Sequence, residues 1–182
     1  MTSAGWRAFP SRRRRPRSRT EGVLADRHAH CEAPFGVLTI VGRGRRLSRL
    51  SLSQLDLTAT HGRPQPEALA PILVQLREYL AGARERFELD LAPQGTPFQR
   101  RVWCGLGLIP FGETRSYAWL AGILEPRSVA RAVGQANGAN PIAIVVPCHR
   151  VIGADGSLVG FGGGLPTKRW LLDHESRQLG LL

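Results

Sequence analysis

The alternation of apolar and polar positions in the first half of the chain predicts a small unit of strands around one helix. Residues 35–40 (FGVLTI) form a short apolar run, and residues 47–57 alternate after two glycines, which is typical of a β-hairpin. Residues 66–80 carry apolar side chains at helical spacing, and residues 87–91 alternate again like a further strand. We therefore expect an N-terminal domain over residues 33–93.

The second half predicts helices. Thr96 is suited to cap a helix, because Pro97 fits the first turn and Gln99 can complete a capping box. Pro110 would end this helix. Its buried stripe would consist of apolar residues at helical spacing: Phe98, Val102, Leu106 and Ile109.

Two shorter helices follow, and together they make a helix-turn-helix candidate. Ser116 can cap the first, and Glu125-Pro126 can form the turn before the second, which we expect over residues 127–138. Such a pair can read DNA, although any helical hairpin gives a similar pattern. The second helix is rich in alanine and glycine around Arg131. It therefore suits either a close approach to a DNA groove or tight internal packing, and the positive charge favours DNA.

Residues 142–146 (IAIVV) form a continuous apolar run, which predicts a short buried strand leading to Pro147-Cys148-His149-Arg150. The expected fold class is α+β. A small N-terminal α/β-type domain with an antiparallel hairpin and a helix precedes a mainly helical C-terminal domain over residues 94–182. This second domain would hold the helix-turn-helix and the buried strand.

Composition adds a strong positive charge. The formal net charge is +11, carried almost entirely by arginine, since Lys168 is the only lysine. A nucleic-acid partner and a solvated basic surface explain this charge equally well. Residues 1–32 hold many arginines and few apolar residues, which predicts a basic tail that does not fold alone. The tail can attract phosphates, act as a targeting signal, or precede the true start of the protein.

We expect no membrane segment, no metal and no disulfide. No apolar run reaches the roughly 18 residues that a transmembrane helix needs, and no signal-peptide core is present. Cys31, Cys104 and Cys148 are irregularly spaced, and there is no CxxC pair or histidine-rich zinc motif, although His28 and His30 lie near Cys31. These features lead us to expect a soluble, cytoplasmic protein.

Cys148 is the candidate for covalent chemistry. A cysteine beside an apolar run is more often an inert core residue than a nucleophile. Here Pro147 restricts the backbone before it and His149 follows directly. A histidine that accepts the thiol proton, directly or through water, raises the thiolate fraction, and a carboxylate such as Glu175 can fix the histidine tautomer. Because neighbouring side chains on a strand point to opposite faces, this requires a turn or a bridging water.

The stretch from Thr96 to Glu175 resembles the methylated-DNA–protein-cysteine methyltransferases, also called O6-alkylguanine-DNA alkyltransferases. The resemblance rests on ordered motifs: TPFQRRVW, IPFGETRSY, ARAVGQANGANP, IVVPCHRVIGADGSLVGFGGGL and KRWLLDHE. The N-terminal half fits the family's first domain in length and pattern only, and the basic tail lies outside the resemblance.

The resemblance implies a role for each matching residue. Cys148 is the alkyl acceptor, and His149 deprotonates it through a bound water with Glu175 behind. Asn140 braces the segment that carries the cysteine, and Tyr117 lies by the flipped base and the DNA backbone, where it helps to neutralise the departing guanine. Arg131 is the finger that enters the duplex and fills the gap left by the flipped nucleotide.

Two further sets of residues follow from the same resemblance. The first set would contact DNA together with Arg131: Ser116, Tyr117, Ala130, Gly134 and Arg150. The base pocket would be lined by the loop after the cysteine, with Phe161 against the base: Val151, Val159, Gly160, Phe161 and Gly162.

The implied function is DNA repair by direct reversal. An alkyl group moves from O6-alkylguanine in double-stranded DNA, with O4-alkylthymine as an alternative substrate, to Cys148 after the base has been flipped. Because water does not readily hydrolyse the thioether product, the protein would act once, as a monomer without a cofactor.

Two departures from the family and three rival interpretations remain. The family's Gly-x-Pro-x-Ala turn is replaced here by Glu125-Pro126, with the proline one position early, and Phe161 stands where some relatives carry tyrosine. The rivals are a DNA-binding protein without catalysis, a cysteine hydrolase or redox protein, and a structural basic protein. The presence of Cys148, without a second cysteine nearby or an oxyanion-hole motif, argues against them.

Overall fold

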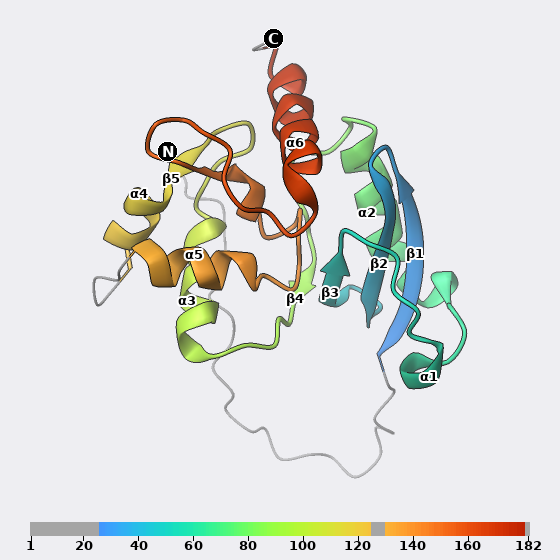
Figure 1. Cartoon of the computed structure of the whole chain (residues 1–182). Coiled ribbons are helices and arrows are strands. Elements are labelled where there is room, and N and C mark those ends of the chain that lie inside the picture. The colour runs from blue at the N-terminus through green and yellow to red at the C-terminus, as the bar shows by residue number, and fades with distance from the viewer. Residues whose placement is uncertain (1–25, 125–129, 181–182) are drawn as a thin grey trace.

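The structure, a computed structural model, describes residues 26–124 and 130–180 (Figure 1). Its N-terminal part consists of a sheet, a 3-10 turn and two helices: β1 (Arg27–Ala33), β2 (Gly36–Arg43), β3 (Arg46–Ser51), α1 (Thr58–His61), η1 (Pro66–Leu69), α2 (Ala70–Leu80) and β4 (Asp90–Leu91). The order in the sheet is β1-β2-β3-β4, with antiparallel pairs except for the short parallel pair of β3 and β4. Helix α2 packs on this sheet with its apolar face: Ile72, Leu73 and Leu76.

The predicted hairpin and helix of this part are confirmed, with shorter limits. The second hairpin strand ends at Ser51 instead of residue 57, and the helix over residues 66–80 begins with a 3-10 turn. The strand expected over residues 87–91 pairs only at Asp90–Leu91.

The predicted limit of the basic tail is wrong. Strand β1 begins at Arg27 and pairs with β2 along its whole length, so residues 27–32 belong to the sheet. This strand has a weak apolar pattern, because the side chains it buries are small or polar, namely those of His28, Ala29 and Cys31. Residues 1–25 of the expected tail lie outside the described residues.

The C-terminal part is mainly helical, which confirms the α+β class. Its described elements are α3 (Pro97–Leu106), β5 (Arg115–Ser116), α4 (Tyr117–Gly122), α5 (Ala130–Gly138), the 3-10 turn η2 (Cys148–Arg150), β6 (Val151–Ile152) and α6 (Gly164–Gln178). The predicted caps are present, since Thr96 and Gln99 form the capping box of α3 and Ser116 Oγ accepts a hydrogen bond from the Trp119 amide. The turn at Glu125-Pro126, and with it the helix-turn-helix connection, lies outside the described residues.

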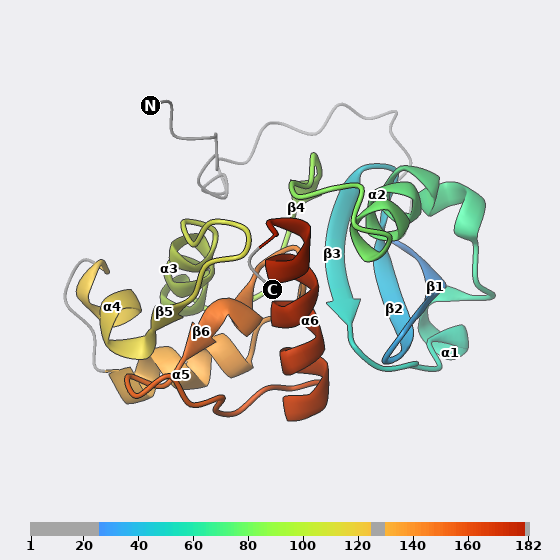
Figure 2. The ribbon, with the colours of Figure 1, turned by 90° about the horizontal axis from the view of Figure 1, so that it is seen from above.

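Helix α6 joins the two parts. Seen from above, it lies between the sheet on one side and the helices α3 and α5 on the other (Figure 2). One cluster of buried side chains runs through both parts, from Leu50 and Tyr79 to Leu106 and Leu171. Among the helices of residues 26–124 and 130–180, none has the length and apolar character to cross a membrane.

Candidate functional site

The segment before Cys148 is folded by the side chain of Asn140. Asn140 Nδ2 donates a hydrogen bond to the carbonyl of Val146 at 2.8 Å, and Asn140 Oδ1 accepts one from the amide of Ile142 at 3.0 Å. These two bonds close residues 140–146 into a compact loop. The loop touches the N-terminal sheet through hydrogen bonds on either side of an isolated bridge between Ile142 and Leu50.

The predicted strand over residues 142–146 is wrong, because the chain turns twice in this stretch. In the first turn, the amide of Val145 donates to the carbonyl of Ala143, and Ile144 between them has a φ of 68°. In the second turn, the amide of Cys148 donates to the carbonyl of Val146, with Pro147 between them. Both are γ-turns, and the first is the strained kind, since a β-branched residue rarely adopts positive φ. The apolar run correctly indicated burial, but burial without alternation does not distinguish a strand from a coiled segment.

Cys148 begins the turn η2 and lies at the edge of a small pocket. The residue is only 5% exposed. The pocket is lined from both parts of the chain: Leu52, Asn137, Gly138, Asn140, Ala143, Cys148, Gly160, Phe161 and Gly162. Burial raises the pKa of the Cys148 thiol, whereas a hydrogen bond with the Asn140 side chain and the charge of Lys168 act in the opposite direction. These two groups therefore stabilise the thiolate in an otherwise apolar position.

His149 and Glu175 form a fully buried pair behind the cysteine. His149 Nε2 lies 2.9 Å from Glu175 Oε1, and both side chains are 0% exposed. Burial lowers the pKa of His149 although Glu175 acts to raise it, so the imidazole is neutral and its Nε2–H points to the carboxylate. The other ring nitrogen, Nδ1, is buried and has no hydrogen-bond partner among the described residues. A basic lone pair is thus available at Nδ1.

Arg150, which the resemblance placed among the DNA contacts, takes part in this buried network. Its guanidinium holds both oxygens of Glu175, with Nε 2.8 Å from Oε2 and Nη2 2.9 Å from Oε1, and Nη1 donates to the carbonyl of Ile109 at 2.8 Å. Arg150 is 8% exposed, and each of its three side-chain nitrogens donates a hydrogen bond within the protein. Burial alone would raise the pKa of Glu175, but His149 and Arg150 hold it well below the usual range.

The loop after the cysteine supplies some of the expected pocket residues. Gly160, Phe161 and Gly162 line the pocket, whereas Val151 and Val159 do not. Val151 is fully buried, and its carbonyl accepts a hydrogen bond from Lys168 Nζ at 2.6 Å. The carbonyl of Val159 accepts a second one at 2.8 Å, while its side chain is 38% exposed. These valines therefore anchor the ends of the loop, and do not line the pocket as expected.

Lys168 and Leu52 are site residues that the sequence reasoning missed. Lys168 is 0% exposed, and no acidic side chain within the described ranges forms an ion pair with it. A buried ammonium without a carboxylate is costly, which points to a specific role in holding the two carbonyls and in stabilising the Cys148 thiolate. Two signals in the sequence pointed to Lys168: it is the single lysine among many arginines, and it begins the motif KRWLLDHE.

Replacing Lys168 by methionine is expected to destabilise the protein and to reduce the reactivity of Cys148. Two carbonyls lose their buried donor, which costs about 1–3 kcal/mol each in the free energy of unfolding. Loss of the positive charge raises the thiol pKa, and the rate of Cys148 alkylation by iodoacetamide at neutral pH falls roughly tenfold per unit of that rise. Urea unfolding and peptide mass spectrometry measure the two effects. The matched control is Arg169→Met, which removes a neighbouring exposed cation, and equal effects of both variants would contradict the prediction.

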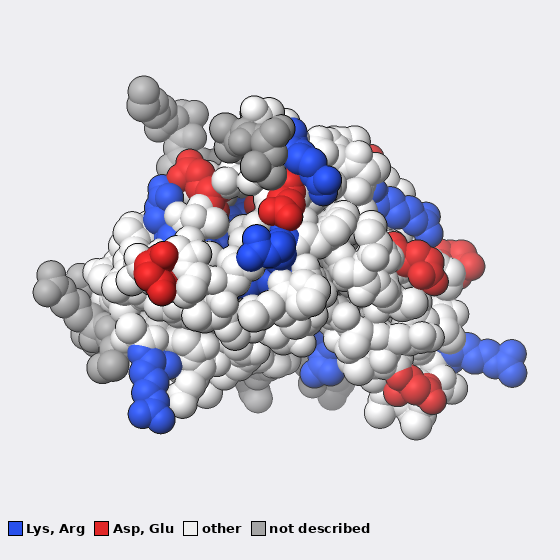
Figure 3. Space-filling model, turned by 45° about the horizontal axis from the view of Figure 1, so that its top comes forward, with Lys and Arg blue, Asp and Glu red and all other residues white. Residues whose placement is uncertain are grey.

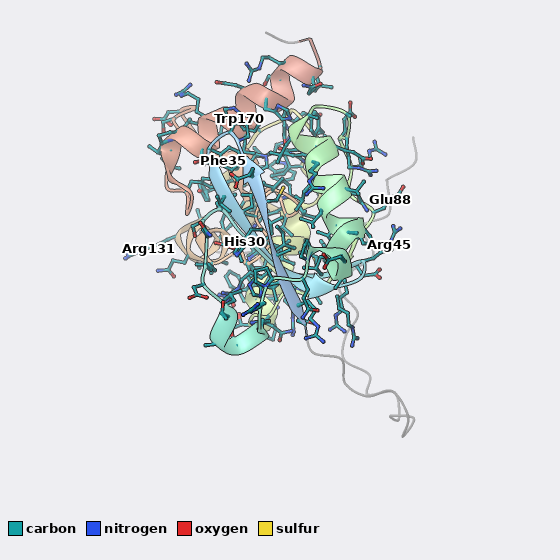
Figure 4. All side chains as sticks on the ribbon, turned by 90° about the vertical axis from the view of Figure 1, so that its right-hand side faces the viewer. His30, Phe35, Arg45, Glu88, Arg131 and Trp170 are labelled. Carbon is teal, nitrogen blue, oxygen red and sulfur yellow. The ribbon has the colours of Figure 1, made fainter. Side chains whose placement is uncertain are left out.

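The residues expected to contact DNA lie around α4 and α5. Arg131 projects from α5 away from the body of the molecule (Figure 4), and it is exposed, as is Ala130. Gly134 faces the ring of Tyr117, because a Cβ added there would lie 3.7 Å from that ring. The half-buried Ser116 uses its hydroxyl oxygen to cap α4. On the face of the molecule shown in Figure 3, basic side chains stand apart from one another and several lie next to acidic ones.

Tyr117 links the surface of α5 to the pocket. Its hydroxyl accepts a hydrogen bond of 3.4 Å from Asn137 Nδ2, and Asn137 itself lines the pocket. Burial, and next the charge of the Cys148 thiolate, raise the pKa of Tyr117. Its hydroxyl is therefore protonated near neutral pH and can act as a donor close to Cys148.

Comparison with known proteins covers both parts of the chain. Residues 27–93 match the family model described as 6-O-methylguanine DNA methyltransferase, ribonuclease-like domain, and residues 97–177 match the model of its DNA binding domain. The chain is 48% identical over 146 residues to the methylated-DNA–protein-cysteine methyltransferase of Mycobacterium tuberculosis, which spans 79% of this chain and 88% of that protein. It is 44% identical over 152 residues to the constitutive enzyme of Bacillus subtilis, with 79% and 92% covered.

Solved structures give the same result. The crystal structure of the Mycobacterium tuberculosis O6-methylguanine methyltransferase matches with a TM-score of 0.77 and 46% identity, over 84% of this chain and 94% of that one. A crystal structure of the OGT protein of the same organism in complex with DNA matches with the same TM-score, identity and coverage.

Proposed function

Because the chain belongs to the methylated-DNA–protein-cysteine methyltransferase family, which repairs DNA by moving an alkyl group to a protein cysteine, we propose that Cys148 is the accepting residue and O6-alkylguanine the substrate. The observation that carries this assignment is the position of Cys148 at a pocket in front of the buried His149–Glu175 pair. Neither Cys31 nor Cys104 lines this pocket.

The proton of the thiol would pass to His149. With Nε2–H held by Glu175, Nδ1 is the acceptor, and a water molecule between Nδ1 and the sulfur would carry the proton. The imidazolium that forms is stabilised by the carboxylate of Glu175, which is held in its ionised form by Arg150. Histidine therefore serves as general base and the carboxylate as the group that orients it.

The transfer itself would be a single displacement at carbon. The sulfur of Cys148 forms a bond to the alkyl carbon, the bond from that carbon to O6 breaks, and its electron pair remains on the guanine. The protonated hydroxyl of Tyr117 can donate a hydrogen bond to the departing base. Because the product is a thioether without an easy leaving group, each molecule would act once. O4-alkylthymine carries a similar O-alkyl group and would be an alternative substrate.

The substrate base would have to leave the DNA stack. Cys148 is 5% exposed and lines a pocket, so its sulfur cannot reach an alkyl carbon that is stacked within a duplex. Arg131 on α5 would occupy the vacated space, and Phe161 would lie against the flipped base. We further expect a cytoplasmic protein that needs no cofactor, and a monomer, because one chain holds every residue of this proposed site.

An oligonucleotide duplex with one O6-methylguanine tests the function directly. After incubation and digestion, the peptide that contains Cys148 is expected to gain the mass of one methylene, which is the net change when a methyl group replaces the thiol hydrogen. The gain should stop at one equivalent per protein molecule. Unmodified Cys148 together with intact O6-methylguanine would contradict the proposal, and repeated turnover would contradict the single use.

Replacing Arg131 by alanine is expected to slow transfer from duplex DNA by about tenfold or more, because filling the gap offsets an unstacking cost of a few kcal/mol. Transfer from free O6-methylguanine base should be unchanged, since no gap forms. Rates of Cys148 methylation on both substrates measure the effect. Arg177→Ala, which removes an exposed arginine from α6, controls for the loss of one charge. An equal loss on duplex and free base would show that Arg131 has another role.

A further inference from the structure

One contact of the buried carboxylate comes from the other part of the chain. Tyr79, on α2, donates its hydroxyl hydrogen to Glu175 Oε1 at 2.8 Å, and Tyr79 is 1% exposed. The same oxygen lies 2.9 Å from His149 Nε2. The other donors to Glu175 belong to the C-terminal part, namely Arg150 and the amide of Gly112. Tyr79 therefore acts on the very oxygen that orients the histidine.

The hydroxyl of Tyr79 is held firmly in this place. His174 Nε2 lies 2.7 Å from the carbonyl of Tyr79, and the His174 ring packs edge-on against the phenol ring with centroids 5.4 Å apart. Phe87 contacts the phenol ring at a centroid distance of 5.4 Å and Phe111 at 6.3 Å. With its backbone and its ring both restrained, Tyr79 cannot withdraw from Glu175 unless α2 moves.

We propose that Tyr79 is a positioning residue for the alkyl transfer, and that through it the N-terminal part of the chain sets the state of the His149–Glu175 pair. This role rests on the proposed function of Cys148. By donating to Oε1, Tyr79 draws negative charge from the oxygen that faces His149. The carboxylate then attracts a proton on the imidazole less strongly, so His149 stays neutral and able to accept the thiol proton.

The effect of Tyr79 on the pKa of His149 adds to the effects of the groups that surround the imidazole. The charged or titratable groups that face His149 are Glu175 and Lys168 from α6, and Arg150 and Cys148 from its own turn. Tyr79 does not face His149 directly, but its hydroxyl donates to Glu175 and so connects α2 to this hydrogen-bond network. Burial lowers the pKa of His149 most strongly. Among the charged groups, Glu175 raises this pKa, whereas Arg150 and Lys168 lower it. Weakening the pull of Glu175 therefore acts in the same direction as the two cations.

A Tyr79→Phe variant tests this role, because it keeps the packed ring and removes only the donor. The acidic limb of the pH–rate profile of Cys148 methylation is expected to move to higher pH by roughly half a unit to one unit. The midpoint of His149 in ¹⁵N NMR titrations should rise with it. A rate reduced by one factor at every pH, with an unchanged His149 midpoint, would show a merely structural role and overturn the proposal.

A control variant at another contact between α6 and the N-terminal part distinguishes a loosened interface from a changed pKa of His149. Phe35 packs edge-on against Trp170 of α6 with ring centroids 5.0 Å apart (Figure 4), and Trp170 in turn stacks on His174 with centroids 4.7 Å apart. Phe35→Leu is expected to lower stability and to leave the acidic limb in place. If the wild-type protein transfers no methyl group, the function of Cys148 itself is refuted. An active wild-type protein whose Tyr79→Phe variant keeps the original limb refutes only the role of Tyr79.

Discussion

Replacing Cys148 by alanine is expected to abolish methyl transfer completely and to leave binding to alkylated duplex DNA unchanged. The sulfur is the only thiol at the pocket, and no other group there combines nucleophilicity with a neighbouring base. Alanine removes one buried atom and keeps the backbone of the turn η2. A methyl-labelled oligonucleotide measures transfer, and electrophoretic band shifts measure affinity.

The matched control for this variant is Cys104→Ala. Cys104 is partly buried on α3 and does not line the pocket, so this variant should still accept one equivalent. Residual methyl transfer to the Cys148→Ala protein would show that another residue is the acceptor. A Cys148→Ala protein that also failed to bind DNA would indicate a structural function of the thiol instead.

Replacing Glu175 by alanine should be the most destabilising single change at the site. Arg150 would be left as a buried guanidinium without a counter-charge, and the hydroxyl of Tyr79 would lose its acceptor. Removing one partner of a buried ion pair costs about 3–5 kcal/mol. Urea unfolding at neutral pH measures this loss. Glu175→Gln, which keeps the shape and one acceptor oxygen, should lose less, and similar stabilities for all three proteins would contradict the buried network.

The lowered pKa of Glu175 also predicts that the folded protein loses stability in acid. The pKa of Glu175 is lower in the folded protein than in the unfolded chain, so its contribution is fully present above the ordinary glutamate value of about 4.3 and is lost as the pH falls towards the folded value. The lowered pKa of His149 acts in the same direction below about 6.5. Unfolding free energies from pH 7 to 3 should therefore fall more steeply for the wild-type protein than for Glu175→Gln.

Local signals in the sequence predicted the elements well. The caps at Thr96 and Ser116 depend on side chains within three residues of the amides they accept from, so they can be recognised without the fold. The hairpin and α2 follow from periodicity alone. The family resemblance, which rested on the second half, is confirmed by matches to both halves.

Contacts between distant residues were beyond the sequence patterns. Tyr79 and Glu175 are 96 positions apart, and Lys168 reaches Val151 across 17. Nothing in the local pattern distinguishes Tyr79 from another apolar position of an amphipathic helix. The ion pair of Arg150 with Glu175 was beyond the local pattern for the same reason, since the two residues are 25 positions apart.

The continuous core has a consequence for the independence of the two family domains. The matched regions at residues 27–93 and 97–177 suggest separable modules, yet Leu52 and Tyr79 of the first complete the pocket and the carboxylate site of the second. A cut at the connection between them would expose the partner face of α6. Neither fragment would then be a self-sufficient folding unit, so the exchange of first domains between relatives is constrained by the pocket and the buried carboxylate of the second.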